Sequence, residues 1–197
     1  MSDEEVMMEF EPEEMPLPDQ RVLGVYGDIN EESTPEFLAS LLHYHHTREG
    51  PPDEEDIIPI LPVDFYIATG GGNVAEMFAI YDMMRMVRED CPIHTFGIGK
   101  VMSAGVLLLA AGTKGERRIG RHCRLMLHRV LTGESGSLHN IQASVKEAEI
   151  MEHMMFEALV EETTLTMKQV KKIVAKNLDA YFSAEEAVEM GIADIIV

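Results

Sequence analysis

Residues 63–99 read VDFYIATGGGNVAEMFAIYDMMRMVREDCPIHTFGIG, and this stretch decides the fold. A β-prone run (63–69) leads through three glycines into a segment with helical periodicity (74–90), which is followed by a second β-prone run (91–99). The apolar residues of the middle segment fall on one helical face: Met77, Ile80, Tyr81, Met84 and Val87. Strand, helix and strand in this order predict parallel strands covered by helices.

The same alternation continues on both sides of this unit. The further expected elements are a strand at 21–29, a helix at 33–49 starting at Ser33 or Thr34, an apolar helix at 103–112, short strands at 117–120 and 124–130, a long helix at about 138–165 and a closing strand at 192–197. We therefore expect residues 21–197 to form one α/β domain, which suits a chain of 197 residues.

Local signals mark several element ends and one long loop. Thr166 with Gln169 and Ser183 with Glu186 form capping boxes, and Gly191 is placed to end the last helix. Residues 49–63 carry four prolines and four adjacent acidic residues, so a surface insertion is expected there.

Charge and composition exclude several classes of protein. The formal net charge is −19, and residues 1–20 hold eight acidic residues and no basic one, which predicts a disordered acidic arm or a docking segment. Such a surface repels nucleic acids and anionic membranes. We find no secretory signal and no apolar run of about 18 residues, so a cytoplasmic location is expected. Cys91 and Cys123 are predicted to be buried thiols rather than metal ligands or a disulfide.

Ser103, in GKVMSAGVLLLAAG (99–112), lies at a predicted strand-to-helix junction. A hydroxyl at this point either caps the helix or is presented as a nucleophile beside free backbone N–H groups. A nucleophile needs a base, and His128 ends an apolar strand where its side chain would reach the rim of the sheet. Asp179 precedes a capped helix and could orient that base. Taken singly, the histidine could equally be bonded to backbone and the aspartate could be an exposed turn residue.

Two other motifs have competing interpretations. The glycines at 70–72 lack the spacing of a dinucleotide or P-loop motif, and are better suited to letting an extended peptide pair with the backbone. His43 and His46 lie one helical turn apart, but without a third ligand a solvated helix face is favoured over a metal site.

Taken together, these segments resemble the proteolytic subunit of the Clp (caseinolytic) protease, ClpP. The similarity runs from about residue 21 to the C-terminus, through GKVMSAGVLLLAAG, RLMLHRV and DAYFSAEEAVEMGIAD, and IYDMMR and AAGTKGERR also match the family. It implies a ClpP/crotonase-like fold of repeated β-β-α units with a protruding handle, made of a strand and the long helix. The first 20 residues would form an axial segment.

The resemblance also implies roles for individual residues. Ser103 would be the nucleophile, His128 the base and then the acid, and Asp179 the orienting carboxylate. The N–H groups of Gly71 and Ala104 would form the oxyanion hole. The substrate strand would lie between two groups of residues: Gly72 and Asn73 on one side, and Val130, Leu131, Thr132 and Gly133 on the other. No metal or other cofactor is implied.

As in similar proteins, subunits would form heptameric rings stacked as a tetradecamer, and an AAA+ Clp ATPase would feed unfolded polypeptides into the chamber. Short peptides would enter unaided. The resulting expectation is a serine endopeptidase subunit.

This chain departs from the usual family pattern at several positions. TGGG (69–72) replaces Ser-Pro-Gly-Gly, Ala104 replaces a methionine, Arg129 and Val130 follow the base in place of Gln-Pro, and Leu178 replaces an arginine before the aspartate. The loop at 49–63 is longer than usual. These departures leave a second possibility, a catalytically silent or impaired ring subunit that acts as a scaffold in a mixed assembly. A crotonase-type enzyme acting on acyl-CoA is disfavoured, because no basic cluster lies near the glycines.

Overall fold

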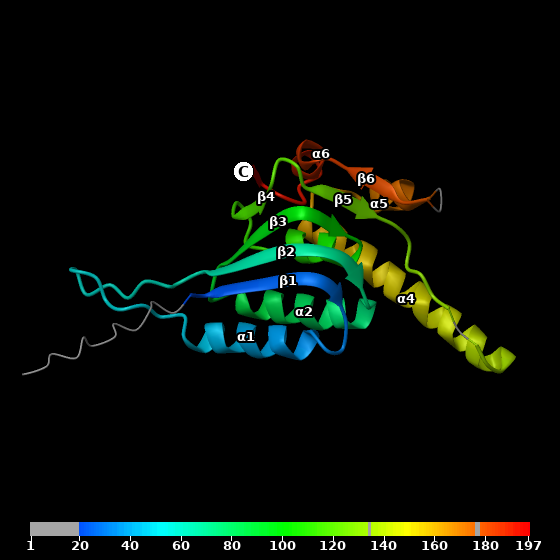
Figure 1. Ribbon diagram of the computed structural model, residues 1–197, viewed down its shortest axis with the longest axis horizontal. Coiled ribbons are helices and arrows are strands. Elements are labelled where there is room, and N and C mark those ends of the chain that lie inside the picture. Colours follow the sequence, from blue (N-terminus) through cyan, green and yellow to red (C-terminus); the bar gives the residue numbers. More distant parts are fainter. Residues whose placement is uncertain (1–19, 134, 176–177) are drawn as a thin grey trace, which may run out of the picture.

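A parallel β-sheet with helices along one face forms the body of the protein, and one long helix projects from it (Figure 1). The computed structural model describes residues 20–133, 135–175 and 178–197. The predicted acidic arm therefore lies outside the described residues, apart from Gln20. The expected α/β class with a parallel sheet is confirmed.

The sheet is built around three parallel strands, β1 (Val22–Ile29), β2 (Val63–Gly72) and β3 (Ile93–Met102). Beyond β3 the sheet divides into two branches. In one branch, β4 (Arg117–Ile119) pairs with the first part of β3, and β7 (Ile195–Ile196) pairs with β4. In the other, β5 (Arg124–Leu127) pairs with the carboxyl-terminal part of β3. Strand β6 (Ala180–Phe182) runs antiparallel to β5. This split brings the carboxyl ends of β2, β3 and β5 to one edge.

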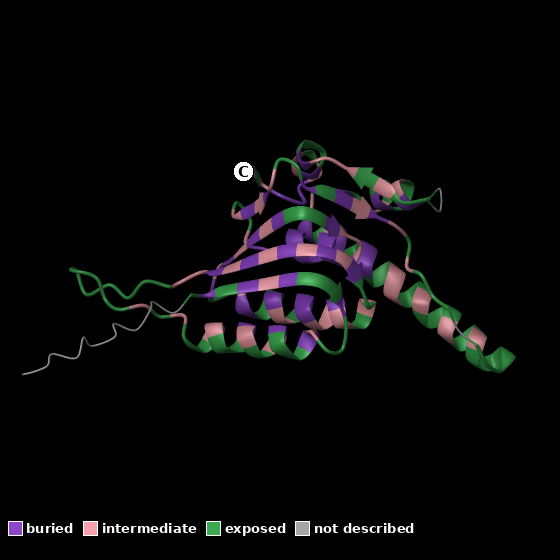
Figure 2. Cartoon of the chain, viewed as in Figure 1, coloured by how far each residue is buried: buried purple, intermediate pink, exposed green. Residues whose placement is uncertain are grey.

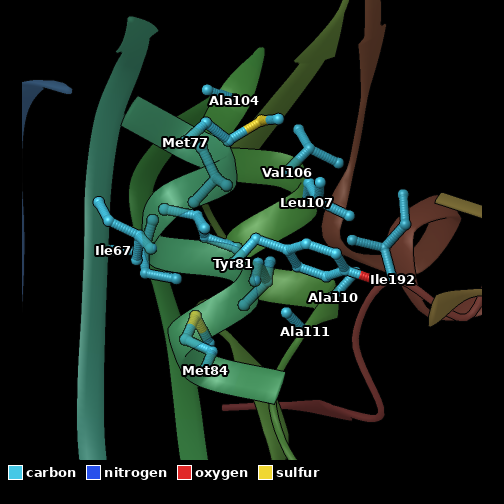
Figure 3. Close-up of a cluster of buried hydrophobic side chains, with 14 of the residues drawn as sticks. Ile67, Met77, Tyr81, Met84, Ala104, Val106, Leu107, Ala110, Ala111 and Ile192 are labelled. Atoms are coloured by element: carbon cyan, nitrogen blue, oxygen red, sulfur yellow. The ribbon is translucent and has the colours of Figure 1, made fainter. Parts of the chain in front are cut away.

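The core lies between the sheet and the helices α1 (Thr34–His46), α2 (Val74–Val87) and α3 (Ala104–Ala110). The predicted apolar face of α2 is buried over its whole length. Figure 3 shows Met77, Tyr81 and Met84 of that face packed beside residues of α3. Helix α3 is buried at every position, so the apolar run at 104–111 is the centre of the domain. Both cysteines are buried and free, as predicted.

The long helix α4 (Leu138–Glu162) is the handle. Its C-terminal half packs into the core through Met155, Phe156 and Leu159, whereas its N-terminal half projects away from the body and is largely exposed (Figure 2). Among the described residues of the segment 128–137 no strand forms, although a handle strand was expected. A strand needs a neighbouring strand to satisfy its N–H and C=O groups, and a single chain supplies none here.

Helices α5 and α6 begin where the sequence indicates. Helix α5 (Met167–Val174) begins at the Thr166–Gln169 capping box, and α6 (Ala184–Glu189) begins at the Ser183–Glu186 capping box. Gly191 follows α6 with a φ of 69°. The predicted insertion between α1 and β2 projects beyond the end of the sheet (Figure 1), with one isolated bridge between Glu49 and Ile60.

A buried charge cluster anchors the inner end of α4. The Glu162 carboxylate, with a side chain only 2% exposed, accepts hydrogen bonds from Arg88 at 2.6 and 2.9 Å and from the Tyr81 hydroxyl at 3.1 Å. Burial and the nearby Glu162 charge raise the pKa of Tyr81 to about 12, so the phenol stays a donor. Burial alone would raise the pKa of Glu162, but the hydrogen bond and charge of Arg88 and the charge of Lys114 hold it below its ordinary value.

This cluster predicts a stability loss in acid. In the unfolded chain Glu162 titrates near its ordinary pKa of about 4, whereas in the folded protein its pKa is lower. Its stabilising contribution is therefore complete above the unfolded pKa and is lost as the pH falls through the folded pKa. We expect the difference in unfolding free energy between wild type and Glu162→Gln, measured by urea denaturation, to shrink from pH 6 to pH 3.5. Parallel pH curves for the two proteins would contradict this.

None of the helices within the described ranges is long and apolar enough to cross a membrane. No group of three or more His, Cys, Asp or Glu side chains suited to a metal ion occurs in the described part of the chain.

Candidate active site

Ser103 occupies the sharp junction between β3 and α3. Its backbone has φ 54° and ψ −120°, a conformation that is strained for a residue with a side chain. Its N–H donates to the carbonyl oxygen of Met126 in β5 at 2.7 Å. The side chain makes no capping hydrogen bond to α3, so the interpretation of this serine as a simple helix cap is not supported. A strained turn that lifts a serine from a strand end toward solvent is typical of nucleophiles.

Two glycines allow the backbone to close around Ser103. A Cβ added to Gly71, whose φ is 105°, would lie 2.6 Å from the Ser103 Cβ. A Cβ on Gly105 would lie 2.4 Å from Cγ2 of Thr69. Real Cβ atoms do not approach neighbours this closely, so the end of β2 and the start of α3 pack against each other only because both positions are glycine.

The predicted oxyanion donor at Gly71 is already engaged. Its N–H donates to Oγ1 of Thr69 at 2.9 Å, and the Thr69 hydroxyl is itself bonded to the carbonyl of Gly27. Gly72, rather than Gly71, lines the pocket that holds Ser103. The next N–H along, that of Asn73, donates to the carbonyl oxygen of Ile29 in β1 at 2.8 Å and is engaged as well.

Ser103 and His128 are brought together at one pocket. His128 directly follows β5, whose residue Met126 pairs with Met102, next to the serine. The pocket has a volume of about 220 Å³, and both side chains contribute to its lining together with Val74, Met77 and Met155. Among the described residues no hydrogen bond joins Ser103 to His128. The apolar lining suits an apolar substrate side chain.

Asp179 is placed opposite His128 by strand pairing. In the antiparallel ladder of β5 and β6, Leu127 pairs with Ala180. Because His128 follows Leu127 and Asp179 precedes Ala180, the same register places His128 across from Asp179. Both residues line a second hollow of about 360 Å³. The exposed Asp179 carboxylate accepts a hydrogen bond from the Tyr181 hydroxyl at 3.4 Å and, within the described chain, none from His128. Ser103, His128 and Asp179 therefore lie near one another, but no hydrogen bond joins them within the described chain.

The predicted substrate-binding residues face one another across a groove. Gly72 and Asn73, at the end of β2, and Val130, Leu131 and Thr132 line a hollow of about 380 Å³ that also meets α4. Gly133 is exposed beside this hollow and does not line it.

Two of these predicted substrate-binding residues, Asn73 and Val130, already use polar groups in hydrogen bonds within the chain. The Asn73 side chain caps α2 by accepting from the N–H groups of Ala75 and Glu76 at 2.8 and 3.3 Å. The N–H of Val130 donates to Glu152 at 3.3 Å. A peptide in the groove would therefore meet other backbone groups of these segments.

An ion pair beside the site was not expected from the sequence. Arg129 donates through Nε and Nη2 to the two carboxylate oxygens of Glu152 at 2.9 and 2.6 Å. This bond lowers the pKa of Glu152 despite the partial burial of that carboxyl. In the sequence, Arg129 is marked only as a departure from the family pattern. Its partner lies 23 residues away on α4, and no local signal in the sequence marks that pairing.

This chain is similar to known proteins along most of its length. The family model described as Clp protease matches residues 15–197. The chain is 34% identical over 178 residues to ATP-dependent Clp protease proteolytic subunit 2 of Mycolicibacterium paratuberculosis, covering 90% of this chain and 82% of that protein. It is 32% identical over 178 residues to ATP-dependent Clp protease proteolytic subunit 1 of Prochlorococcus marinus strain MIT 9312, covering 90% and 84% respectively.

Proposed function

Because the chain belongs to the Clp protease family, we propose that it is a serine endopeptidase subunit whose triad is Ser103, His128 and Asp179. The observation that carries the proposal is the placement of the serine. It lies on a strained junction, free of a capping role, in the same pocket as a histidine that follows β5, and β5 pairs with β6, which the aspartate directly precedes. The proposed substrates are unfolded polypeptides and short peptides.

The proposed reaction proceeds through an acyl-enzyme. His128 takes the proton of the Ser103 hydroxyl as Oγ bonds to the scissile carbonyl carbon, and the carbonyl oxygen becomes an oxyanion. His128 then protonates the departing amine as the C–N bond breaks. Water, deprotonated by the same imidazole, attacks the ester and releases the acid while the proton returns to Ser103. Asp179 holds the imidazole in the required tautomer.

The N–H groups that meet the oxyanion are proposed to be those of Ala104 and of the glycine loop. Ala104 is the first residue of α3, where backbone N–H groups have no partner within the helix. In the loop, the Gly72 N–H is the better placed donor, because that of Gly71 is bonded to Thr69. Gly71 retains its role as the residue that permits close approach to Ser103.

Assembly is proposed to complete the site. The handle exposes Leu138, Val145 and Ile150 to solvent in the single chain, and Leu131, in the segment that precedes it, is 82% exposed. Apolar side chains gathered on one projecting element favour burial against a second copy. We propose heptameric rings stacked as a tetradecamer in the cytoplasm, with an AAA+ Clp ATPase delivering substrates. Packing of the handles would give residues 128–133 a neighbouring strand.

One observation favours the second candidate, a silent or impaired subunit that acts as a scaffold. In the described chain, Ser103, His128 and Asp179 share no hydrogen bond, and Asp179 is bonded instead to Tyr181. A triad that never closed would leave the serine a weak nucleophile.

Labelling with a fluorophosphonate probe tests the proposal, because the probe reacts with an activated serine. We expect wild-type protein, in an assembly of ring size by size-exclusion mass measurement, to be labelled, and Ser103→Ala to assemble equally well without labelling or peptide cleavage. Peptide cleavage that persists in Ser103→Ala would exclude this nucleophile. An unlabelled wild-type ring would favour the scaffold.

A further inference from the structure

The segment that follows His128 has few attachments to the rest of the protein. Within the described residues 129–133, the hydrogen bonds that reach other elements all end on the Glu152 carboxylate, from the Arg129 side chain and from the Val130 N–H. The segment forms no strand, and Leu131 is almost fully exposed. Its hydrogen bonds to other elements therefore all depend on one acidic side chain of α4, beside the packing of the partly buried Val130 against the core.

Glu152 is well suited to hold this segment. It lies just before Met155, where α4 enters the core, so its backbone belongs to the anchored half of the helix. Its side chain is 12% exposed and accepts both Arg129 donors in a parallel fork. Forked arginine–carboxylate bonds fix orientation as well as distance, unlike single contacts between exposed charges. The lowered pKa of Glu152 keeps the carboxylate charged at neutral pH.

His128 lies between two fixed points of the backbone. On its N-terminal side, Met126 is paired with Met102 and accepts the Ser103 N–H. On its C-terminal side, the next two residues are held by Glu152. The imidazole has no hydrogen bond of its own among the described residues, so its distance from Ser103 is set by these two attachments.

We propose that Arg129 and Glu152 are positioning residues, forming a clamp between the end of β5 and the handle that holds His128 in reach of Ser103. This inference rests on the proposed peptidase function. The clamp acts through His128 and touches neither the scissile bond nor the nucleophile. It also couples the site to the handle, because any shift of α4 at Glu152 moves the residue next to the base.

The test is the rate of fluorophosphonate labelling in Arg129→Gln and Glu152→Gln. The probe carries no peptide backbone, so its rate reports the alignment of Ser103 and His128 rather than substrate-strand binding. We expect each variant to label at least about tenfold more slowly, because small displacements of catalytic groups cost one to two orders of magnitude in rate. The double variant should be labelled no more slowly than the slower of the two single variants, because both substitutions remove the same interaction.

Controls separate positioning from folding. Glu161→Gln removes another arginine–glutamate pair of α4, with Arg85 of α2, away from the pocket, and should label at the wild-type rate. Ring mass and melting temperature should match wild type in both clamp variants. For a short peptide substrate, kcat should fall while KM changes little.

The outcomes distinguish the two proposals. Wild-type labelling that depends on Ser103, with unchanged rates in Arg129→Gln and Glu152→Gln, would overturn the clamp and leave the peptidase intact. Additive losses in the double variant would also overturn it. A wild-type ring that is not labelled at Ser103 would overturn the peptidase and, with it, the role of the clamp.

Discussion

Replacing Gly71 with alanine is expected to reduce peptide cleavage at least about 100-fold while leaving most of the fold intact. The new Cβ would lie 2.6 Å from Cβ of Ser103 and 3.2 Å from its Oγ. Gly71 also has a φ of 105°, which an L-residue rarely adopts. Either the serine or the glycine loop must move, and a loss of this size is typical when one oxyanion donor is displaced.

The matched control for this prediction is the preceding glycine. A Cβ on Gly70 would meet Asp28 and Lys100 only at 3.9 Å, an ordinary contact, so Gly70→Ala should keep most of the activity. The measurement is kcat/KM for a short peptide, together with the mass of the assembly. Near-normal cleavage by Gly71→Ala would show that Ser103 is not held in the position described here.

Elements that depend on neighbouring residues in the chain were predictable from the sequence. The buried face of α2 follows from apolar residues at helical spacing, and both capping boxes join residues only three positions apart. The location of Ser103 follows similarly, because a serine between a strand and an apolar helix, with glycines nearby, has few possible placements. The triad was assigned by resemblance, whereas the shared pocket and the β5–β6 register come from the structure.

Features that depend on residues distant in the chain were not predictable. The bond from the Gly71 N–H to Thr69 is local, but the Thr69 hydroxyl is held in place by Gly27, more than 40 residues earlier. The fork from Arg129 to Glu152 requires α4 to return past the end of β5. The expected handle strand is absent from the described residues of 128–137, because a strand is a property of two chain segments and only one of them lies in the single chain.

The buried charge cluster at the end of α4 leads to the largest expected effect on stability. Replacing Glu162 with leucine would leave the Arg88 guanidinium, whose side chain is 21% exposed, without its carboxylate partner. The Tyr81 hydroxyl would also lose the acceptor of its 3.1 Å hydrogen bond. Removing one member of a buried ion pair costs about 3–5 kcal/mol, because the remaining charge stays desolvated and unpaired.

For a chain of this size, such a loss lowers the melting temperature by roughly 10 °C. The matched control is Glu161→Leu, one residue away, which removes an exposed pair with Arg85 and should cost less than about 1 kcal/mol. Both should be compared by calorimetry at equal protein concentration, since assembly itself adds to apparent stability. Equal melting temperatures for the two variants would mean that Glu162 does not anchor the handle. A selective loss in Glu162→Leu would mean that the inner end of α4, on which Glu152 and the base-bearing segment depend, is held by charge as well as by apolar packing.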